Sequence, residues 1–193
     1  MDPRLDPDLV EHGDTRNVVD RYRNWSVDAI VADLDQRRHP FHVAIENFEH
    51  DMNIGSVVRS ANAFLAAEVH IVGNRRWNRR GAMVTERYQH VRHHESIDAF
   101  GTWAAASGLP VLGIDNIEGS VPIETYDIPA ACVLLFGQEG PGLSEAAQEL
   151  CVDLLAITQF GSTRSINAGA AAAVAMHAWT RRHVFGQPPS PPS

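Results

Sequence analysis

The segment Ile157–Asn167 has residue types that suit the binding of a small polar ligand. It follows a short apolar stretch, is rich in Gly, Ser and Thr, and continues into an alanine run at 170–173. Ser165 and Asn167 stand where the loop would open a helix, whose first backbone amides have no partner inside the helix. The pattern predicts a site that holds a small polar cofactor through main-chain groups.

A second segment, Phe136–Ser144, places three glycines around Glu139. Glycine has no side chain, so a ligand can approach the backbone closely there. The segment is not a phosphate-binding P-loop, because the Lys-Ser/Thr ending is missing. It is not a dinucleotide fingerprint either, because the spacing differs and an acid stands at its centre.

A third segment carries Asn53 and Arg59 at the start of a predicted helix. Their separation places them within two turns of each other, near the exposed end of that helix. Taken alone, an N-cap and a solvated arginine would explain this pair. Its interest comes from its combination with the other two segments.

The elements that must position these segments alternate along the chain. Helices are predicted at 26–38, 53–65, 82–88, 96–107, 145–151 and 165–184, and strands at 42–46, 68–72, 90–94, 111–114, 131–136 and 154–157, with a loop at 122–126. This alternation predicts an α/β fold with a mostly parallel sheet flanked by helices. We expect a flexible acidic tail at 1–17, a single domain with an N-terminal helical extension at 18–185, and a disordered Pro-rich tail at 186–193.

Composition favours a soluble globular protein. The chain has 193 residues, of which 44% are hydrophobic and 21% charged. No apolar run is long enough to span a bilayer and Met1–Arg4 lacks a signal-peptide pattern, so we expect no membrane association and a cytoplasmic location. Cys132 and Cys151 stand in apolar contexts without metal-ligand spacing, which predicts buried free thiols.

The three segments together resemble a known family. In order they read Asn-x-Gly-x-x-x-Arg, Phe-Gly-x-Glu-x-x-Gly-Leu-Ser and Ile…Gly-x-x-x-Ser-Ile-Asn-Ala-Gly-x-Ala. This resembles the SPOUT superfamily, and more narrowly the TrmH-type (SpoU) RNA 2′-O-ribose methyltransferases, over 42–182. The resemblance implies a SPOUT fold with a deep C-terminal trefoil knot, S-adenosylmethionine bound in the knot, and a homodimer. Thr158-Gln159 replaces the usual Pro-Met and Ile166 replaces leucine, changes that bear on loop shape.

The resemblance also implies roles for single residues. The cofactor-binding positions are Ile114, Gly137, Ile157, Ser165 and Ile166, and the catalytic positions are Arg59, Asn53, Glu139, Ser165 and Asn167. A guanidinium has a pKa above about 12, so we expect Arg59 to clamp the RNA phosphate and the 2′-oxygen, with the phosphate helping deprotonation. We expect Asn53 to orient Arg59. We expect Glu139 and Asn167 to hold the motif loops to each other, with a position of Glu139 facing the sulfonium as the alternative.

A local basic run offers a surface for RNA despite the acidic balance. The formal net charge is −8, which counts against nucleic-acid binding, but binding depends on the local patch. Arg75, Arg76, Arg79 and Arg80 surround Trp77, so the arginines can meet phosphates while the tryptophan stacks on a base. The alternative is a solvated loop with the tryptophan packed beneath it.

Two functional alternatives stay open, and no metal is expected. The first is a member of the fold that binds RNA or S-adenosylmethionine without methylating, and the second is a small-molecule methyltransferase. The modest N-terminal extension favours tRNA over rRNA by family analogy. Adjacent strand residues point to opposite faces, so His93 and His94 do not share an ion, and no Cys or carboxylate completes a site with His90.

Overall fold

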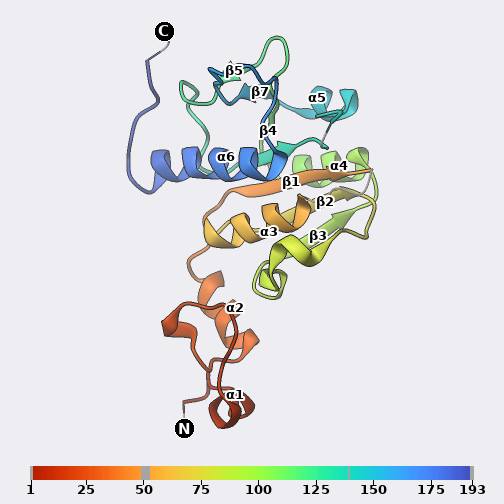
Figure 1. The fold of residues 1–193 in the computed structure, drawn as a ribbon. Coiled ribbons are helices and arrows are strands. Elements are labelled where there is room, and N and C mark those ends of the chain that lie inside the picture. Colours follow the sequence, from red (N-terminus) through yellow and green to blue (C-terminus); the bar gives the residue numbers. More distant parts are fainter. Residues whose placement is uncertain (1, 49–52, 139, 192–193) are drawn as a thin grey trace.

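The computed structural model describes residues 2–48, 53–138 and 140–191. Its centre is a seven-stranded sheet in which every pair of neighbouring strands is parallel. The strands lie in the order β3 (Val91–His94), β2 (Val69–Gly73), β1 (His42–Asn47), β6 (Val133–Phe136), β4 (Val111–Ile114), β7 (Asp153–Ala156) and β5 (Val121–Pro122). The predicted α/β architecture with a parallel sheet is therefore confirmed (Figure 1).

Helices cover both faces of this sheet. α3 (Ile54–Ala63) and α6 (Ala168–His183) pack on one face, and α4 (Ile97–Ser107) and α5 (Glu145–Leu150) pack on the other. Strand β1 shows the consequence, because Val43 and Ile45 face the first helix layer and Ala44 faces the second. Strands buried on both faces read as continuous apolar runs rather than as alternating ones.

Side chains and one glycine cap several helix ends. Ser26 begins α2 (Val27–Asp35) and Ser144 begins α5, and each hydroxyl accepts a hydrogen bond from the backbone amide three residues later. Gly108 ends α4 with a φ of 66°, a left-handed conformation that glycine adopts at little cost.

Several predicted boundaries were wrong, three of them near the motif segments or at the sheet edge. α6 begins at Ala168 rather than at 165, because the Asn167 side chain caps its first turn. The segment at 82–88 forms parts of two 3₁₀ turns, Arg79–Ala82 and Thr85–Arg87, instead of one helix. The loop predicted at 122–126 begins with a residue of β5, and proline is tolerated there because β5 is an edge strand.

The acidic N-terminal segment is partly helical, and its flexibility stays a prediction. It contains α1 (Pro7–His12), which Asp6 caps, and Asp14 binds Arg16 in a salt bridge with an N···O distance of 2.7 Å. The Arg16 guanidinium also donates to the Trp25 carbonyl oxygen at 2.7 Å. The segment thus folds back onto the residues before α2, and both helices lie at the end of the molecule farthest from β5 and β7 (Figure 1).

The state of the two cysteines and the lengths of the helices can be compared with what the sequence predicted. Both cysteines are free, and burial raises the pKa of Cys132 and of Cys151 to about 12, so both stay protonated at neutral pH. Within the described ranges, no helix combines the length and apolar character that a membrane crossing needs. The trefoil knot stays a prediction.

Candidate active site

The segments Phe136–Ser144 and Ile157–Asn167 meet around one cavity of about 530 Å³. It opens at the carboxyl ends of β4, β6 and β7, the edge at which open α/β sheets bind ligands. Its lining includes all five residues predicted to bind the cofactor, namely Ile114, Gly137, Ile157, Ser165 and Ile166. A volume of this size suits a nucleoside-sized ligand, and the binding role of these residues stays a prediction.

A tight loop shapes one wall of the cavity. Gln138 and Gly142 exchange two backbone hydrogen bonds of 3.1 Å each. A Cβ atom at Gly137 would overlap the Gly142 backbone, so only glycine fits there. Asp115, which directly follows β4, accepts a hydrogen bond from the Leu143 amide at 2.8 Å and also lines the cavity. Glu139 lies outside the described residues, so its role stays a prediction.

A buried acid that the sequence analysis missed anchors the end of this loop. Glu46 is fully buried in β1, and its carboxylate accepts hydrogen bonds from the Ser144 amide at 2.9 Å and from the Ser144 hydroxyl at 2.6 Å. Buried carboxylates are rare unless they are paired or hydrogen-bonded. A glutamate inside an otherwise apolar strand was the available signal for such a contact.

The first and third motifs are joined by a direct side-chain contact. The Asn167 amide nitrogen donates to Oδ1 of Asn53 at 2.8 Å, while Oδ1 of Asn167 accepts from the Ala170 amide at 3.2 Å. Gly169 permits this approach, because a Cβ atom there would lie 3.1 Å from the Ser56 Cβ. The structure therefore joins Asn53 to Asn167, which lines the cavity together with Ser165.

Arg59 lies apart from these groups. It is exposed on α3 and is not among the described residues that line the cavity. Among the hydrogen bonds of the described residues, none is donated by its guanidinium, which leaves that group available to a ligand at the surface. Orientation of Arg59 by Asn53 stays a prediction.

The departure from the family's usual Pro-Met has a local explanation. Thr158 donates hydrogen bonds from its amide and its hydroxyl to the two Glu124 carboxylate oxygens, at 3.2 and 2.9 Å. Proline has no amide hydrogen and could not make the first contact. Gln159 lines the cavity, and its buried Oε1 has no hydrogen-bond donor among the described residues. That oxygen is a ready acceptor for a donor group of a bound ligand.

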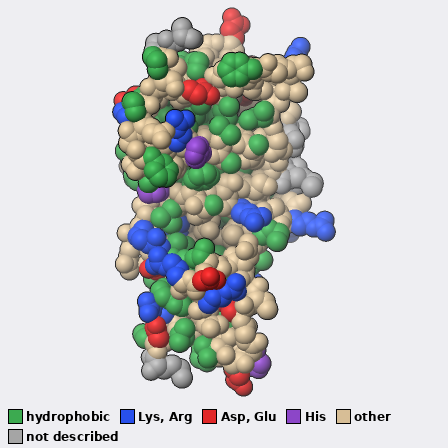
Figure 2. All heavy atoms as spheres, turned by 60° about the vertical axis from the view of Figure 1, so that its left-hand side comes forward, with side chains coloured by type: hydrophobic (Ala, Val, Ile, Leu, Met, Phe, Trp, Pro, Cys, Tyr) green, Lys and Arg blue, Asp and Glu red, His purple; other side chains and the backbone are tan. Residues whose placement is uncertain are grey.

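The basic run packs beside the start of α3. The arginine side chains Arg75, Arg76, Arg79 and Arg80 are exposed, whereas Trp77 is half-buried against the core with the Arg79 guanidinium 5.6 Å from its ring centroid. The chain's 16 basic residues are all arginines, and Figure 2 shows several of them across the middle of one face. Because one part of Trp77 is packed, stacking on a base is restricted to its exposed part.

The geometry defines an α/β protein with a cofactor-sized cavity at the carboxyl edge of its sheet. The model of the SpoU rRNA methylase family matches residues 40–177, and the chain belongs to this family. Its fold is the SPOUT fold of the SpoU structures that it resembles.

Relatives and solved structures support this assignment. An uncharacterized tRNA/rRNA methyltransferase of Mycolicibacterium vanbaalenii is 33% identical over 141 residues, which cover 69% of this chain and 44% of that protein. The SpoU methyltransferase AviRb of Streptomyces viridochromogenes, solved with AdoMet, is 25% identical with a TM-score of 0.70, over 80% of this chain and 62% of AviRb.

A third similar protein was solved in a study of the 2-OH methylation of C/U34 on tRNA. It is 26% identical with a TM-score of 0.67, over 77% of this chain and 99% of that one. The chain spans less than half the length of the curated relatives that it matches.

Proposed function

We propose that the chain transfers a methyl group from S-adenosylmethionine to a ribose 2′-hydroxyl of structured RNA, in the cytoplasm. The observation that carries this proposal is the cavity at the carboxyl edge of the sheet, which two motif segments line and the third reaches through the Asn53–Asn167 contact. Family membership and the AdoMet bound to AviRb support the same reading.

The residues of the cavity fit this cofactor. The narrow loop at Gly137 leaves the backbone open to a flat ring, while Ile114, Ile157 and Ile166 supply apolar surface on which an adenine can pack. The unpartnered Oε1 of Gln159 offers an acceptor for an amino group. When bound, the sulfonium supplies an activated methyl group, so the protein's main task is to position the acceptor.

Arg59 would then act at the acceptor. A guanidinium is a hydrogen-bond donor with no acceptor, so Arg59 clamps the phosphate and the 2′-oxygen rather than serving as a free base. Asn53 and Asn167 act as positioning residues that fix the start of α3 relative to the start of α6. Ser165 and Glu139 complete the polar set that the family resemblance implies.

RNA would lie on the arginine run, across a homodimer. The four exposed arginines beside the start of α3 can neutralise phosphates of an RNA that reaches Arg59 on the same helix. Val174 on α6 is 41% exposed, and this helix offers an apolar face to a second copy. The similarity to a protein studied for 2-OH methylation of tRNA favours tRNA over rRNA.

Transfer of tritiated methyl groups tests the proposal. The purified chain is incubated with labelled S-adenosylmethionine and bulk tRNA or rRNA, and the RNA is digested to nucleosides. We expect label in tRNA as a 2′-O-methylnucleoside. Cofactor binding without transfer to any RNA would instead support the non-methylating alternative, and label in small molecules alone would support the small-molecule methyltransferase.

A further inference from the structure

Three histidines from three adjacent strands lie in a row on one face of the sheet. In the registers β1–β2 and β2–β3, Ala44 pairs with His70 and Val72 pairs with His94. His42 therefore precedes Ala44, the β1 partner of His70, by two residues, and His94 follows Arg92, the β3 partner of His70, by two. Even offsets keep all three side chains on the same face, so the line depends on strand order rather than on sequence spacing.

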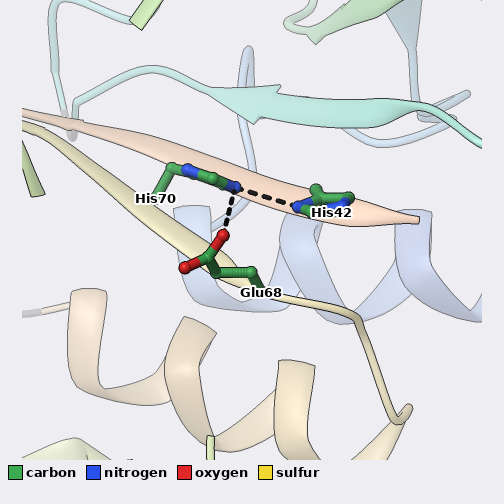
Figure 3. Close-up of side chains that lie close together, drawn as sticks. All are labelled: His42, Glu68 and His70. Atoms are coloured by element: carbon green, nitrogen blue, oxygen red, sulfur yellow. Dashed lines mark hydrogen bonds and ion pairs between the residues drawn. The ribbon is translucent and has the colours of Figure 1, made fainter. Parts of the chain in front are cut away.

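These side chains contact one another through their ring nitrogens. Nδ1 of His42 lies 3.0 Å from Nε2 of His70, and Nδ1 of His70 lies 2.9 Å from Nε2 of His94. Glu68 stands two residues before His70 on the same face, with Oε2 at 3.7 Å from Nε2 of His70. Figure 3 shows the side chains of His42, Glu68 and His70 pointing toward one another.

We propose that His42, Glu68 and His70 form a binding site for a divalent transition-metal ion of the zinc type. The three candidate ligand atoms lie within 4.8 Å of one another. Four ligands at Zn–N and Zn–O distances of about 2.0–2.2 Å around a tetrahedral ion are separated by roughly 3.3–3.5 Å. The separations of 3.0 and 3.7 Å lie on either side of this value, so small side-chain shifts admit the ion.

The surrounding residues provide the outer contacts that such sites use. With Nε2 of His70 bound to the ion, its Nδ1 hydrogen is donated to Nε2 of the buried His94. Oε1 of Glu68 accepts a hydrogen bond from Arg92 at 3.1 Å, which leaves Oε2 for the ion. Metal-binding histidines and carboxylates are commonly held by such second partners, which set the tautomer and the ring orientation.

Access and position define the role of the site. His70 is fully buried and the Trp103 ring lies over it at a centroid distance of 4.0 Å, whereas His42 and Glu68 are only partly buried. An ion therefore enters from the amino ends of β1 and β2, the edge of the sheet opposite the cofactor cavity. The ion would join two neighbouring strands, which makes the site structural rather than catalytic.

The competing arrangement is a chain of neutral imidazoles without an ion. In it, one proton bridges His42 and His70, and both nitrogens of His70 are satisfied by hydrogen bonds. The ion takes the place of that proton, which moves to the other nitrogen of the same ring, and accepts a lone pair from each ring. The position of Oε2 of Glu68 favours the ion, because at 3.7 Å from Nε2 of His70 it is too far to accept a hydrogen bond from that ring but close enough to share a metal ion with it. This site replaces our expectation of no metal, which considered histidines close in sequence.

Titration of the full chain with Zn²⁺, and with Co²⁺ as a spectroscopic probe, tests the proposal after treatment with a chelator. We expect one ion per chain and a Co²⁺ spectrum of low coordination number. We also expect Tm to rise by roughly 5–10 °C when free Zn²⁺ exceeds Kd about 100-fold. Glu68→Gln and His42→Gln should each raise Kd at least ~10-fold.

His93→Gln is the matched control, because Nε2 of His93 contacts the Gly73 carbonyl oxygen at 2.7 Å instead of this cluster. It should bind Zn²⁺ as the unaltered chain does. Circular dichroism of each variant in chelator shows whether its fold is kept, and Glu68→Gln is the gentler change because Glu68 is not fully buried. Absence of one-to-one binding, or unchanged Kd values in both ligand variants, would overturn the proposal.

Discussion

The side chains of Asn167 and Asn53 are joined by a hydrogen bond of 2.8 Å across 114 positions of the sequence. The same Asn167 side chain caps α6 through its oxygen, so its amide is oriented from both ends. One residue thus sets the start of the helix that follows the cofactor loop and ties it to the helix that carries Arg59. The Asn167 side chain therefore fixes the position of the Asn53–Arg59 segment and of the Ile157–Asn167 segment at the same time.

Asn167 variants separate these two contacts. Asn167→Ala removes both, and loss of the cap alone should lower the free energy of unfolding by about 1–2 kcal/mol. Asn167→Asp keeps the capping oxygen but loses the donor to Asn53. We expect near-normal stability in urea unfolding and reduced methyl transfer for this variant. Equal loss of stability in both variants would show that the Asn53 contact, not the cap, holds the helix.

Gly137→Ala tests the shape of the loop after β6, which forms one wall of the cavity. A Cβ atom at this position overlaps the Gly142 backbone, so the loop must open and the cavity wall must shift. We expect S-adenosylmethionine binding, measured by calorimetry, to weaken at least ~10-fold, which is about 1.4 kcal/mol. Gly161→Ala is the control, because no atom lies within 4 Å of a Cβ atom built there. Equal affinities for the two variants would place the cofactor elsewhere.

Arg59→Ala tests the acceptor clamp. Removal of one charged donor at a reacting centre commonly lowers kcat by about 10²–10³. Arg59 does not line the cavity among the described residues, so cofactor Kd should stay within about twofold. Arg87→Ala removes another exposed arginine and should leave kcat unchanged. Full activity of Arg59→Ala in the methyl-transfer assay would refute the assigned role.

Charge reversal tests the arginine run. Arg76→Glu with Arg79→Glu should weaken tRNA binding and lower the slope of log Kd against log salt by about one to two. The reason is that binding releases about one counterion fewer for each phosphate contact that is lost. Arg181→Glu with Arg182→Glu makes the same charge change at the far end of α6. An unchanged slope in the first double variant would favour a solvated loop above a packed Trp77.

The sequence predicted which edge of the sheet the motif segments share, but not the contacts that hold them there. Segments that follow parallel strands lie at the same edge of a sheet, and Gly137 and Ile157 line one cavity there because only β4 separates β6 from β7. The Glu46–Ser144 contact and the histidine row depend on which strands are neighbours and in which register. Local patterns do not encode that information. The N-terminal segment was predicted as a tail because its acidic residues were counted without their arginine partners.

The acid stability of that N-terminal segment gives the last prediction. The Arg16 guanidinium, by hydrogen bonding, holds the pKa of the Asp14 carboxyl well below its usual value near 3.8. An acid whose pKa is lower in the folded state stabilises the fold fully above its unfolded pKa and loses that contribution as pH falls toward the folded value. Below about pH 4, the segment should therefore loosen around Trp25, whose carbonyl oxygen accepts from Arg16. Trp25 fluorescence should report this loosening. Asp14→Asn should show weaker packing already at pH 7 and a flatter pH dependence, and parallel acid profiles of both chains would show that another group controls the segment.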